Sequence, residues 1–193
     1  MPGSIVQVST SPGGVPKLPV PQGEITTLGL AGDGHNDTAN HGGPERALCL
    51  FSIERIEAMA AEGHPIAPGS TGENVTIRGI DWDAVVPGAR LRLGTDVLVE
   101  VTRYTTPCKT NQQWFMAGDI NRMHQDLHPG FSRVYAKVLQ PGIIRPGDPV
   151  ELLPSGPLRV QDLAQRLANL VDLFVGHFRV HRQADLAREE ALR

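Results

Sequence analysis

Cysteine and long apolar runs are both scarce in this chain of 193 residues. Its two cysteines, Cys49 and Cys108, are too few for a disulfide framework, so we expect reduced thiols and a cytoplasmic location. No apolar run approaches the roughly 20 residues that span a bilayer, and the N-terminus lacks the basic region and apolar core of a signal peptide. The net charge of −3 gives no reason to expect nucleic acid or a membrane as a partner.

Glycine and proline are frequent instead, with 21 and 16 residues. This abundance favours many turns between short strands over a helical bundle. A hydrophobic content of 40% and a charged content of 20% are typical of a globular protein that buries a core. The length fits one domain, or one domain with a small appendage.

Short apolar segments predict seven or more strands, at residues 4–9, 47–51, 75–77, 89–93, 97–101, 133–139 and 150–153. Ser52 is the predicted N-cap of a helix that ends near Glu62, because Gly63 and Pro65 follow. Asp119 is the predicted start of a short helix through Leu127. These elements predict a mainly β (α+β) fold, a β-barrel with two or three short peripheral helices.

The composition changes at residues 154–157, beyond which apolar residues recur with helical spacing. We therefore predict a β-barrel domain over residues 1–154 and a short helical extension over residues 155–193. The charged, weakly amphipathic residues 178–193 suggest a helix that docks on a partner subunit, so a homodimer is an expectation.

Cys108 lies in the segment TTPCKTN, residues 105–111, directly after the strand predicted at 97–101. Pro107 ends the strand because it has no backbone N–H to donate. Held beside hydroxyl groups and Lys109, Cys108 is placed to present a thiolate to a cavity. The alternative is a small buried residue in a loop. Cys49 lies inside a continuous apolar run and is assigned to the core.

Residues 29–46, GLAGDGHNDTANHGGPER, form the most polar and glycine-rich segment. Its acidic and histidine residues suggest a metal site, but their spacing matches no established motif. The alternative interpretation is an oxyanion site formed by His41, Gly42, Gly43 and Arg46, because glycines allow close backbone approach and arginine binds phosphate.

Two further polar positions are candidates for a site. Lys17 follows the first strand in a turn-rich loop, where it is either a solvated surface charge or a group that reaches an anionic ligand. Asn74 and Glu73 stand at the junction of a turn and a strand, where side chains commonly line a site.

Taken together, these segments resemble the MOSC family, named after the C-terminal part of molybdenum cofactor sulfurase. The resemblance covers residues 4–153 and rests on ordered motifs: Gly32-Asp33, His41-Gly42-Gly43-Pro44-Glu45-Arg46-Ala47, Gly72-Glu73-Asn74, Pro107-Cys108 and Gly147-Asp148. The tail is similar to a shortened form of the helical extension in YiiM-like bacterial members. The resemblance implies a MOSC/pyruvate-kinase-barrel-like β-barrel.

The resemblance also implies a molybdopterin form of the molybdenum cofactor, with Cys108 as the thiolate ligand of the metal and the catalytic residue. A soft thiolate suits such a metal. The implied cofactor-binding residues are His41, Gly42, Gly43 and Arg46 for the phosphate and pterin edge, Asn74 and Asn111 for pterin or oxo groups, and Lys17 as a weaker candidate.

Related proteins reduce N-hydroxylated compounds such as hydroxylamino bases and amidoximes, so the resemblance implies a molybdenum-dependent N-hydroxylate reductase. No flavin, haem or iron–sulfur motif is present in the sequence, so an external electron-transfer protein is the expected partner. Pyridoxal phosphate is not expected. The alternative is a non-catalytic carrier of the molybdenum cofactor or of sulfur. Arg133 stands where a small residue is expected, and it either narrows the substrate site or adds a phosphate contact.

Overall fold

The computed structural model describes residues 3–36 and 42–154. The strands are β1 (Gly3–Thr10), β2 (Leu18–Val20), β3 (Gly23–Thr26), β4 (Gly29–Leu30), β5 (Leu48–Ser52), β6 (Val75–Arg78), β7 (Arg90–Leu93), β8 (Val97–Tyr104), β9 (Val134–Gln140), β10 (Gly142–Ile144) and β11 (Pro149–Leu153). The helices are α1 (Ile53–Ala61) and the short 3-10 helices η1 (Pro44–Arg46), η2 (Trp82–Ala84), η3 (Lys109–Trp114), η4 (Met116–Gly118) and η5 (Ile120–Met123).

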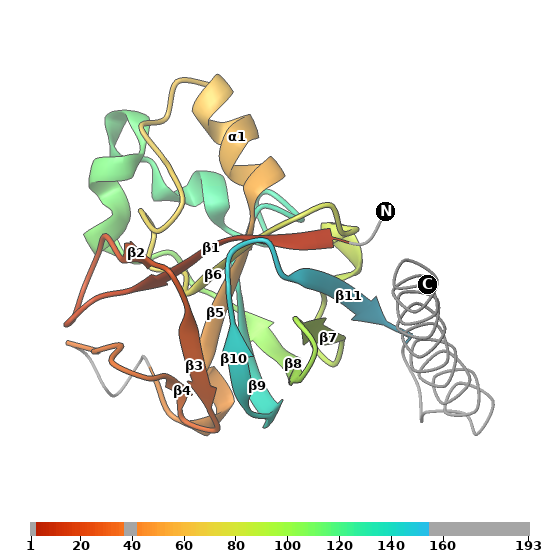
Figure 1. Ribbon diagram of the computed structural model, residues 1–193. Coiled ribbons are helices and arrows are strands. Elements are labelled where there is room, and N and C mark those ends of the chain that lie inside the picture. The colour runs from red at the N-terminus through yellow and green to blue at the C-terminus, as the bar shows by residue number, and fades with distance from the viewer. Residues whose placement is uncertain (1–2, 37–41, 155–193) are drawn as a thin grey trace, which may run out of the picture. The chain divides into compact units, whose positions relative to one another are not determined.

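Seven strands close into a barrel in the order β1, β6, β5, β9, β8, β7 and β11 (Figure 1). Closure comes from β11, which pairs with β1 through Gly3 and Val150. Neighbouring strands are antiparallel except β5 and β6, which run parallel with Leu50 opposite Val75. The predicted mainly β barrel with few helices is confirmed.

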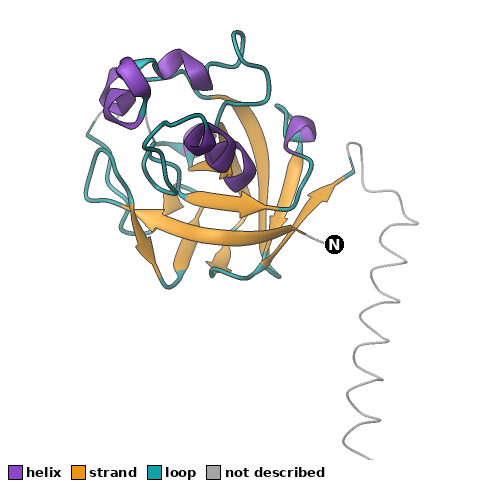
Figure 2. Cartoon of the chain, turned by 90° about the horizontal axis from the view of Figure 1, so that it is seen from above, coloured by secondary structure: helices purple, strands orange, loops and turns teal. Residues whose placement is uncertain are grey.

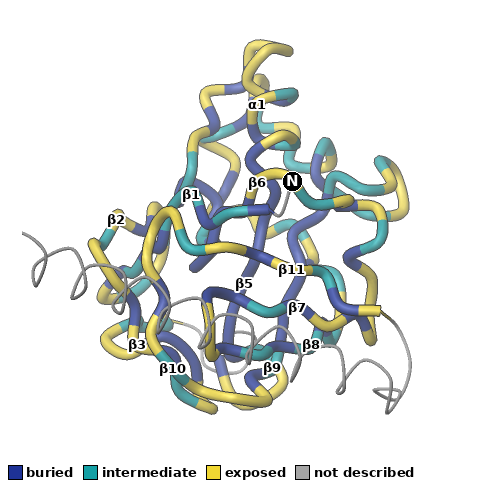
Figure 3. Tube along the Cα trace, turned by 45° about the vertical axis from the view of Figure 1, so that its right-hand side comes forward, coloured by how far each residue is buried: buried dark blue, intermediate teal, exposed yellow. Residues whose placement is uncertain are grey.

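Along β7 and β8 the side chains that form the barrel core alternate with more exposed ones. Leu91 and Leu93 of β7 are fully buried, as are Val97 and Val99 of β8. β5 differs because all five of its residues are buried (Figure 3), as its continuous apolar run predicted. One face of β5 therefore packs on the core while the other is covered by different parts of the chain.

The predicted helix is α1, and its N-cap is Ser52, whose side chain accepts a hydrogen bond from Arg55 N at 3.3 Å. Its buried face consists of Ile53, Ile56 and Met59. In Figures 1 and 2, α1 and the 3-10 helices η3, η4 and η5 lie over the end of the barrel away from β3, β4 and β10.

Two parts of the described chain differ from expectation. A separate three-stranded sheet, β10–β3–β4, was not predicted, because its strands have only two to four residues and show no clear alternation. The helix expected from Asp119 to Leu127 is the single 3-10 turn η5, which ends because His124 has extended backbone angles.

The predicted extension, residues 155–193, lies outside the described residues, so the domain boundary and the homodimer stay predictions. Among the described helices, none has the length and apolar character that crossing a membrane requires.

Candidate functional site

A cavity of about 190 Å³ brings together segments that are distant in the sequence. Six of the predicted site residues line it: Lys17, Gly42, Arg46, Asn74, Cys108 and Asn111. Gly43 is exposed beside Gly42 but is not part of this lining, and His41 lies outside the described residues. The fold thus brings residues from separate sequence motifs together in one cavity.

The cavity lies on the face of β5 and β9 opposite the barrel core. Cys49 of β5 is paired with Tyr135 of β9, and both side chains line the cavity. Their neighbours, Leu48 and Leu50, belong to the hydrophobic core. Because successive side chains of a strand point to opposite faces, the cavity lies on the second face of β5 at Cys49, whereas Phe51 on the same face is buried in the hydrophobic core.

Cys108 is the exposed cysteine, and it immediately precedes η3. Hydrogen bonds to the side chain and backbone of Thr110 and the positive charge of Arg133 lower the pKa of the Cys108 thiol, although partial burial opposes them. A lowered pKa increases the thiolate fraction at neutral pH, and the thiolate is the nucleophilic and metal-binding form.

Cys49 has the opposite character. It is 4% exposed, and burial raises the pKa of its thiol. The prediction that it belongs to the buried interior is confirmed, although it also contacts the cavity. The two thiols therefore differ, because one is an accessible, activated group and the other is an inert part of the wall.

Lys17 is buried rather than solvated, so the surface-charge interpretation is wrong. Its ammonium pairs with Oδ2 of Asp33, and the two side chains are only 7% and 4% exposed. The same Asp33 oxygen accepts a 2.9 Å hydrogen bond from Asn74 Nδ2, and Oδ1 accepts one from Ser11 N at 3.1 Å. Asp33 thus fixes a cation at the cavity wall.

Asn74 also joins two barrel strands. Its Oδ1 accepts a hydrogen bond from Cys49 N at 3.0 Å, and its Nδ2 donates to Ser9 O at 3.3 Å. Because these bonds and the bond to Asp33 engage the amide, Asn74 positions the wall of the cavity. A ligand role for Asn74 stays a prediction.

The glycine-rich segment packs closely against the cavity. At Gly42, where φ is +74°, an added Cβ would lie 2.6 Å from Cδ2 of His35, so the glycine is required there. Thr102 Oγ1 donates to Glu45 O at 2.6 Å, which ties the turn carrying Arg46 to β8. The turn therefore holds Arg46 in the lining.

Arg133 and Asn111 are two buried residues of the same lining. Arg133 Nη1 and Asn111 Nδ2 both donate to Thr71 O, the second bond being 3.5 Å long. Arg133 Nε and Asn111 Oδ1 are buried without a hydrogen-bond partner. The sequence indicated Arg133 only as a departure from the family pattern, and it gave no signal for Thr71.

Tyr135 is a further lining residue that sequence reasoning missed. Burial raises the pKa of its phenol to about 12, so the hydroxyl stays protonated at neutral pH. The available signal was its position between the apolar residues Val134 and Ala136 in the strand predicted at residues 133–139, because neighbouring side chains of a strand point to opposite faces.

The cavity wall is cationic. Lys17, Arg46 and Arg133 line it, whereas none of its described lining residues is a carboxylate. Within the described ranges, no group of three or more histidine, cysteine, aspartate or glutamate side chains is arranged to hold a metal ion. The site suits an anionic ligand better than a bare metal cation.

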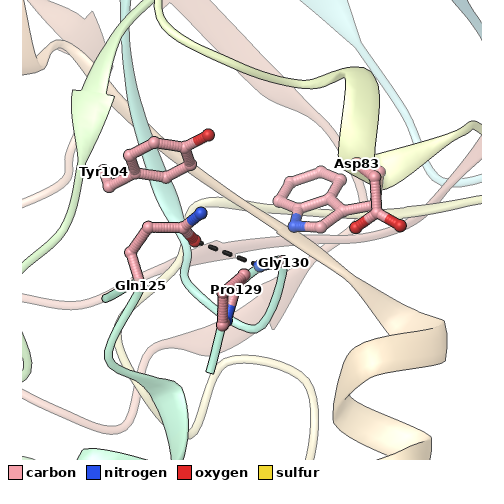
Figure 4. Close-up of a pocket in the computed structure, with 6 residues that line it drawn as sticks. Asp83, Tyr104, Gln125, Pro129 and Gly130 are labelled. Carbon is pink, nitrogen blue, oxygen red and sulfur yellow. Dashed lines mark hydrogen bonds between the residues drawn. The ribbon is translucent and has the colours of Figure 1, made fainter. Parts of the chain in front are cut away.

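A second cavity of about 270 Å³ lies beside Tyr104, at the end of the strand that leads to Cys108 (Figure 4). Trp82, Asp83 and Gln125 also line it, and Gln125 Oε1 accepts a 3.2 Å hydrogen bond from Gly130 N. Its lining contains none of the predicted site residues, so the chemistry above belongs to the first cavity.

The family profile that describes the MOSC domain matches residues 37–151. The chain belongs to this family. MOSC domains are associated in general with binding of the molybdenum cofactor. The match includes the segments that carry Gly42, Arg46, Asn74 and Cys108.

Curated relatives support a YiiM-like member of the family. The chain is 32% identical to "Protein YiiM" of Escherichia coli over 149 residues, which are 74% of this chain and 64% of that protein. It is 32% identical to "Uncharacterized protein YflK" of Bacillus subtilis over 127 residues, 65% of this chain and 56% of that protein. A protein named "Reductase" from Gibberella moniliformis is 31% identical over 133 residues, 66% of this chain and 23% of that protein. The chain thus spans less than two thirds of each of these relatives.

Solved structures agree on the fold. The crystal structure of YiiM from Escherichia coli has a TM-score of 0.61 and 28% identity, and the match covers 84% of this chain and 75% of that one. YiiM from Geobacillus stearothermophilus gives a TM-score of 0.59 and 26% identity, with 79% and 76% covered.

Proposed function

We propose that this chain binds a molybdopterin form of the molybdenum cofactor and reduces N-hydroxylated compounds, such as hydroxylamino bases and amidoximes. The observation that carries the proposal is the position of Cys108, an accessible thiol with a lowered pKa on a cavity lined by three basic residues. A cofactor that carries a metal and a phosphate requires a thiolate ligand for the metal and basic residues for the phosphate.

The residues present fit this group. Arg46 and the backbone N–H groups of Gly42 and Gly43 are suited to a phosphate. The buried, unpartnered Oδ1 of Asn111 is suited to an N–H donor of a pterin edge. Lys17 supplies further positive charge, although Asp33 already balances part of it.

When bound, the cofactor supplies two-electron redox chemistry beside Cys108. Conversion of an N–OH group to N–H consumes two electrons and two protons and releases one water. We propose that a separate electron-transfer protein delivers the electrons. The exposed position of Cys108 supports this proposal, because substrate and partner can both approach from solvent.

The metal assignment is tested by the molybdenum content of protein produced with cofactor synthesis intact. We expect roughly stoichiometric molybdenum in the wild type and loss of most of it in Cys108→Ala, since the thiolate ligand is gone. Lys109→Ala is the matched control, because Lys109 is exposed next to Cys108 and does not line the cavity. Equal molybdenum in wild type and Cys108→Ala would refute the ligand assignment.

An assay of catalytic turnover distinguishes an enzyme from a carrier of the cofactor or of sulfur. The cofactor-loaded protein, supplied with a chemical electron donor, is expected to reduce hydroxylaminopurine catalytically. Cofactor-loaded protein that shows no turnover but transfers its cofactor to an apo-enzyme would support the carrier instead.

A further inference from the structure

Arg133 is fixed in the cavity wall by its surroundings. Its carbonyl accepts a 3.0 Å hydrogen bond from Thr105 N, and the adjacent Ser132 hydroxyl donates to Thr105 O at 3.2 Å. Trp82 Nε1 donates to Ser132 O at 3.2 Å. These bonds hold the start of β9 against the end of β8, so the inward position of Arg133 is imposed by the fold.

The charge of Arg133 is buried without a balancing carboxylate among the described residues. The residue is only 6% exposed, and the one hydrogen bond of its side chain within those ranges is to the neutral Thr71 O. Glu73, two residues after Thr71, has its carboxylate bound by Gly69 N and the Thr71 hydroxyl. A buried charge without an ionic partner is costly.

Two buried polar atoms in the same part of the cavity wall have no hydrogen-bond partner. Arg133 Nε and Asn111 Oδ1 are both buried without hydrogen-bond partners. Both side chains donate a hydrogen bond from another atom to the same acceptor, Thr71 O. Buried polar atoms are nearly always hydrogen-bonded in native proteins, so each exception calls for an explanation. A ligand that brings negative charge to this wall accounts for the uncompensated guanidinium.

We propose that Arg133 binds an oxyanion beside Cys108, so that this cavity takes a ligand carrying a phosphate or a carboxylate at that wall. The inference rests on the cavity of the proposed function, but it requires no molybdenum. The oxyanion has two sources, the phosphate of the cofactor or an acid group on the substrate, and both share the chemistry that a guanidinium recognises.

The test uses cofactor-free protein and inorganic phosphate, with binding measured by calorimetry. Arg133→Met keeps much of the side-chain length and removes the charge, and we expect phosphate affinity to fall about tenfold or more, as for loss of a charged hydrogen bond. Lys109→Met removes a nearby exposed charge and is expected to leave the affinity unchanged. Absence of phosphate binding by the wild type, or a loss below fivefold in Arg133→Met, overturns the proposal.

Urea unfolding of the cofactor-free proteins separates ligand binding from a structural role. Removing an uncompensated buried charge is expected to leave the midpoint of Arg133→Met equal to or above that of the wild type. A lower midpoint together with lost phosphate binding would assign Arg133 a structural role and overturn the proposal. Arg133→Lys keeps the charge and is expected to retain measurable phosphate binding.

The same measurement on cofactor-loaded protein identifies the source of the oxyanion. If the cofactor supplies it, loading abolishes phosphate binding. If the substrate supplies it, phosphate binding persists and Arg133→Met raises KM for acid-bearing substrates more than for neutral ones. Either result supports the oxyanion site. Cys108→Ala is expected to lose molybdenum yet keep phosphate binding, so failure of the metal assignment and failure of this inference are distinguishable.

Discussion

The buried ion pair of Lys17 and Asp33 predicts that the two single substitutions destabilise the fold by different amounts. In Asp33→Asn, the Lys17 ammonium loses its one partner among the described residues and stays 7% exposed. In Lys17→Met, the Asp33 carboxylate keeps its hydrogen bonds from Ser11 N and Asn74 Nδ2. Removing the carboxylate is therefore expected to destabilise the fold more than removing the lysine.

The magnitudes follow from the cost of an unpaired buried charge. Loss of one partner of a buried ion pair costs about 3–5 kcal/mol, which we assign to Asp33→Asn. Lys17→Met leaves a carboxylate that is still hydrogen-bonded, and we expect about 1–2 kcal/mol. With an m-value of about 2 kcal/mol/M, the urea midpoints are expected to fall by about 2 M and by less than about 1 M respectively.

The assay is equilibrium unfolding in urea, followed by circular dichroism on cofactor-free protein. The double variant Lys17→Met/Asp33→Asn removes the unpaired charge, so its midpoint is expected to lie above that of Asp33→Asn alone. Equal midpoints for the two single variants, or a larger loss for Lys17→Met, would refute this account of the pair.

Three shorter predictions concern other features of the structure. Thr110→Val removes the main hydrogen bond that lowers the pKa of Cys108, so the pKa is expected to rise and alkylation by iodoacetamide at pH 7 to slow, which mass spectrometry measures. Gly42→Ala places a Cβ against His35 at positive φ, and we expect a loss of about 1–2 kcal/mol in urea unfolding and a lower molybdenum content. Ser52→Ala removes the N-cap of α1, for which a loss of about 1 kcal/mol is expected in the same urea assay.

The strands that the sequence predicted are those with strong local signals. The alternation in residues 89–93 and 97–101 reflects one face on the core, and it became the hairpin of β7 and β8. β3, β4 and β10 have two to four residues, too few for alternation to be recognised, and their pairing depends on contacts distant in sequence.

The same limit applies to the site. Cys108 and Arg46 were predicted because each stands in a motif with its own local chemistry. Asp33 was part of a motif, yet nothing local showed that its carboxylate meets Lys17, 16 residues earlier, and Asn74, 41 residues later. Arg133 was noticed as an unusual residue, but its burial is set by the pairing of β8 and β9.

The complete burial of β5 shows how one sequence pattern can have two physical causes. A continuous apolar run predicts a strand covered on both faces, and it does not distinguish a second hydrophobic layer from a ligand cavity. The pairing of Cys49 with Tyr135 resolves the ambiguity, because these residues line the cavity while Leu48 and Leu50 lie in the core. A small cysteine on the cavity face leaves space there that a leucine would fill. The same run of residues therefore packs Leu48, Leu50 and Phe51 in the hydrophobic core and contributes Cys49 to the wall of the proposed site.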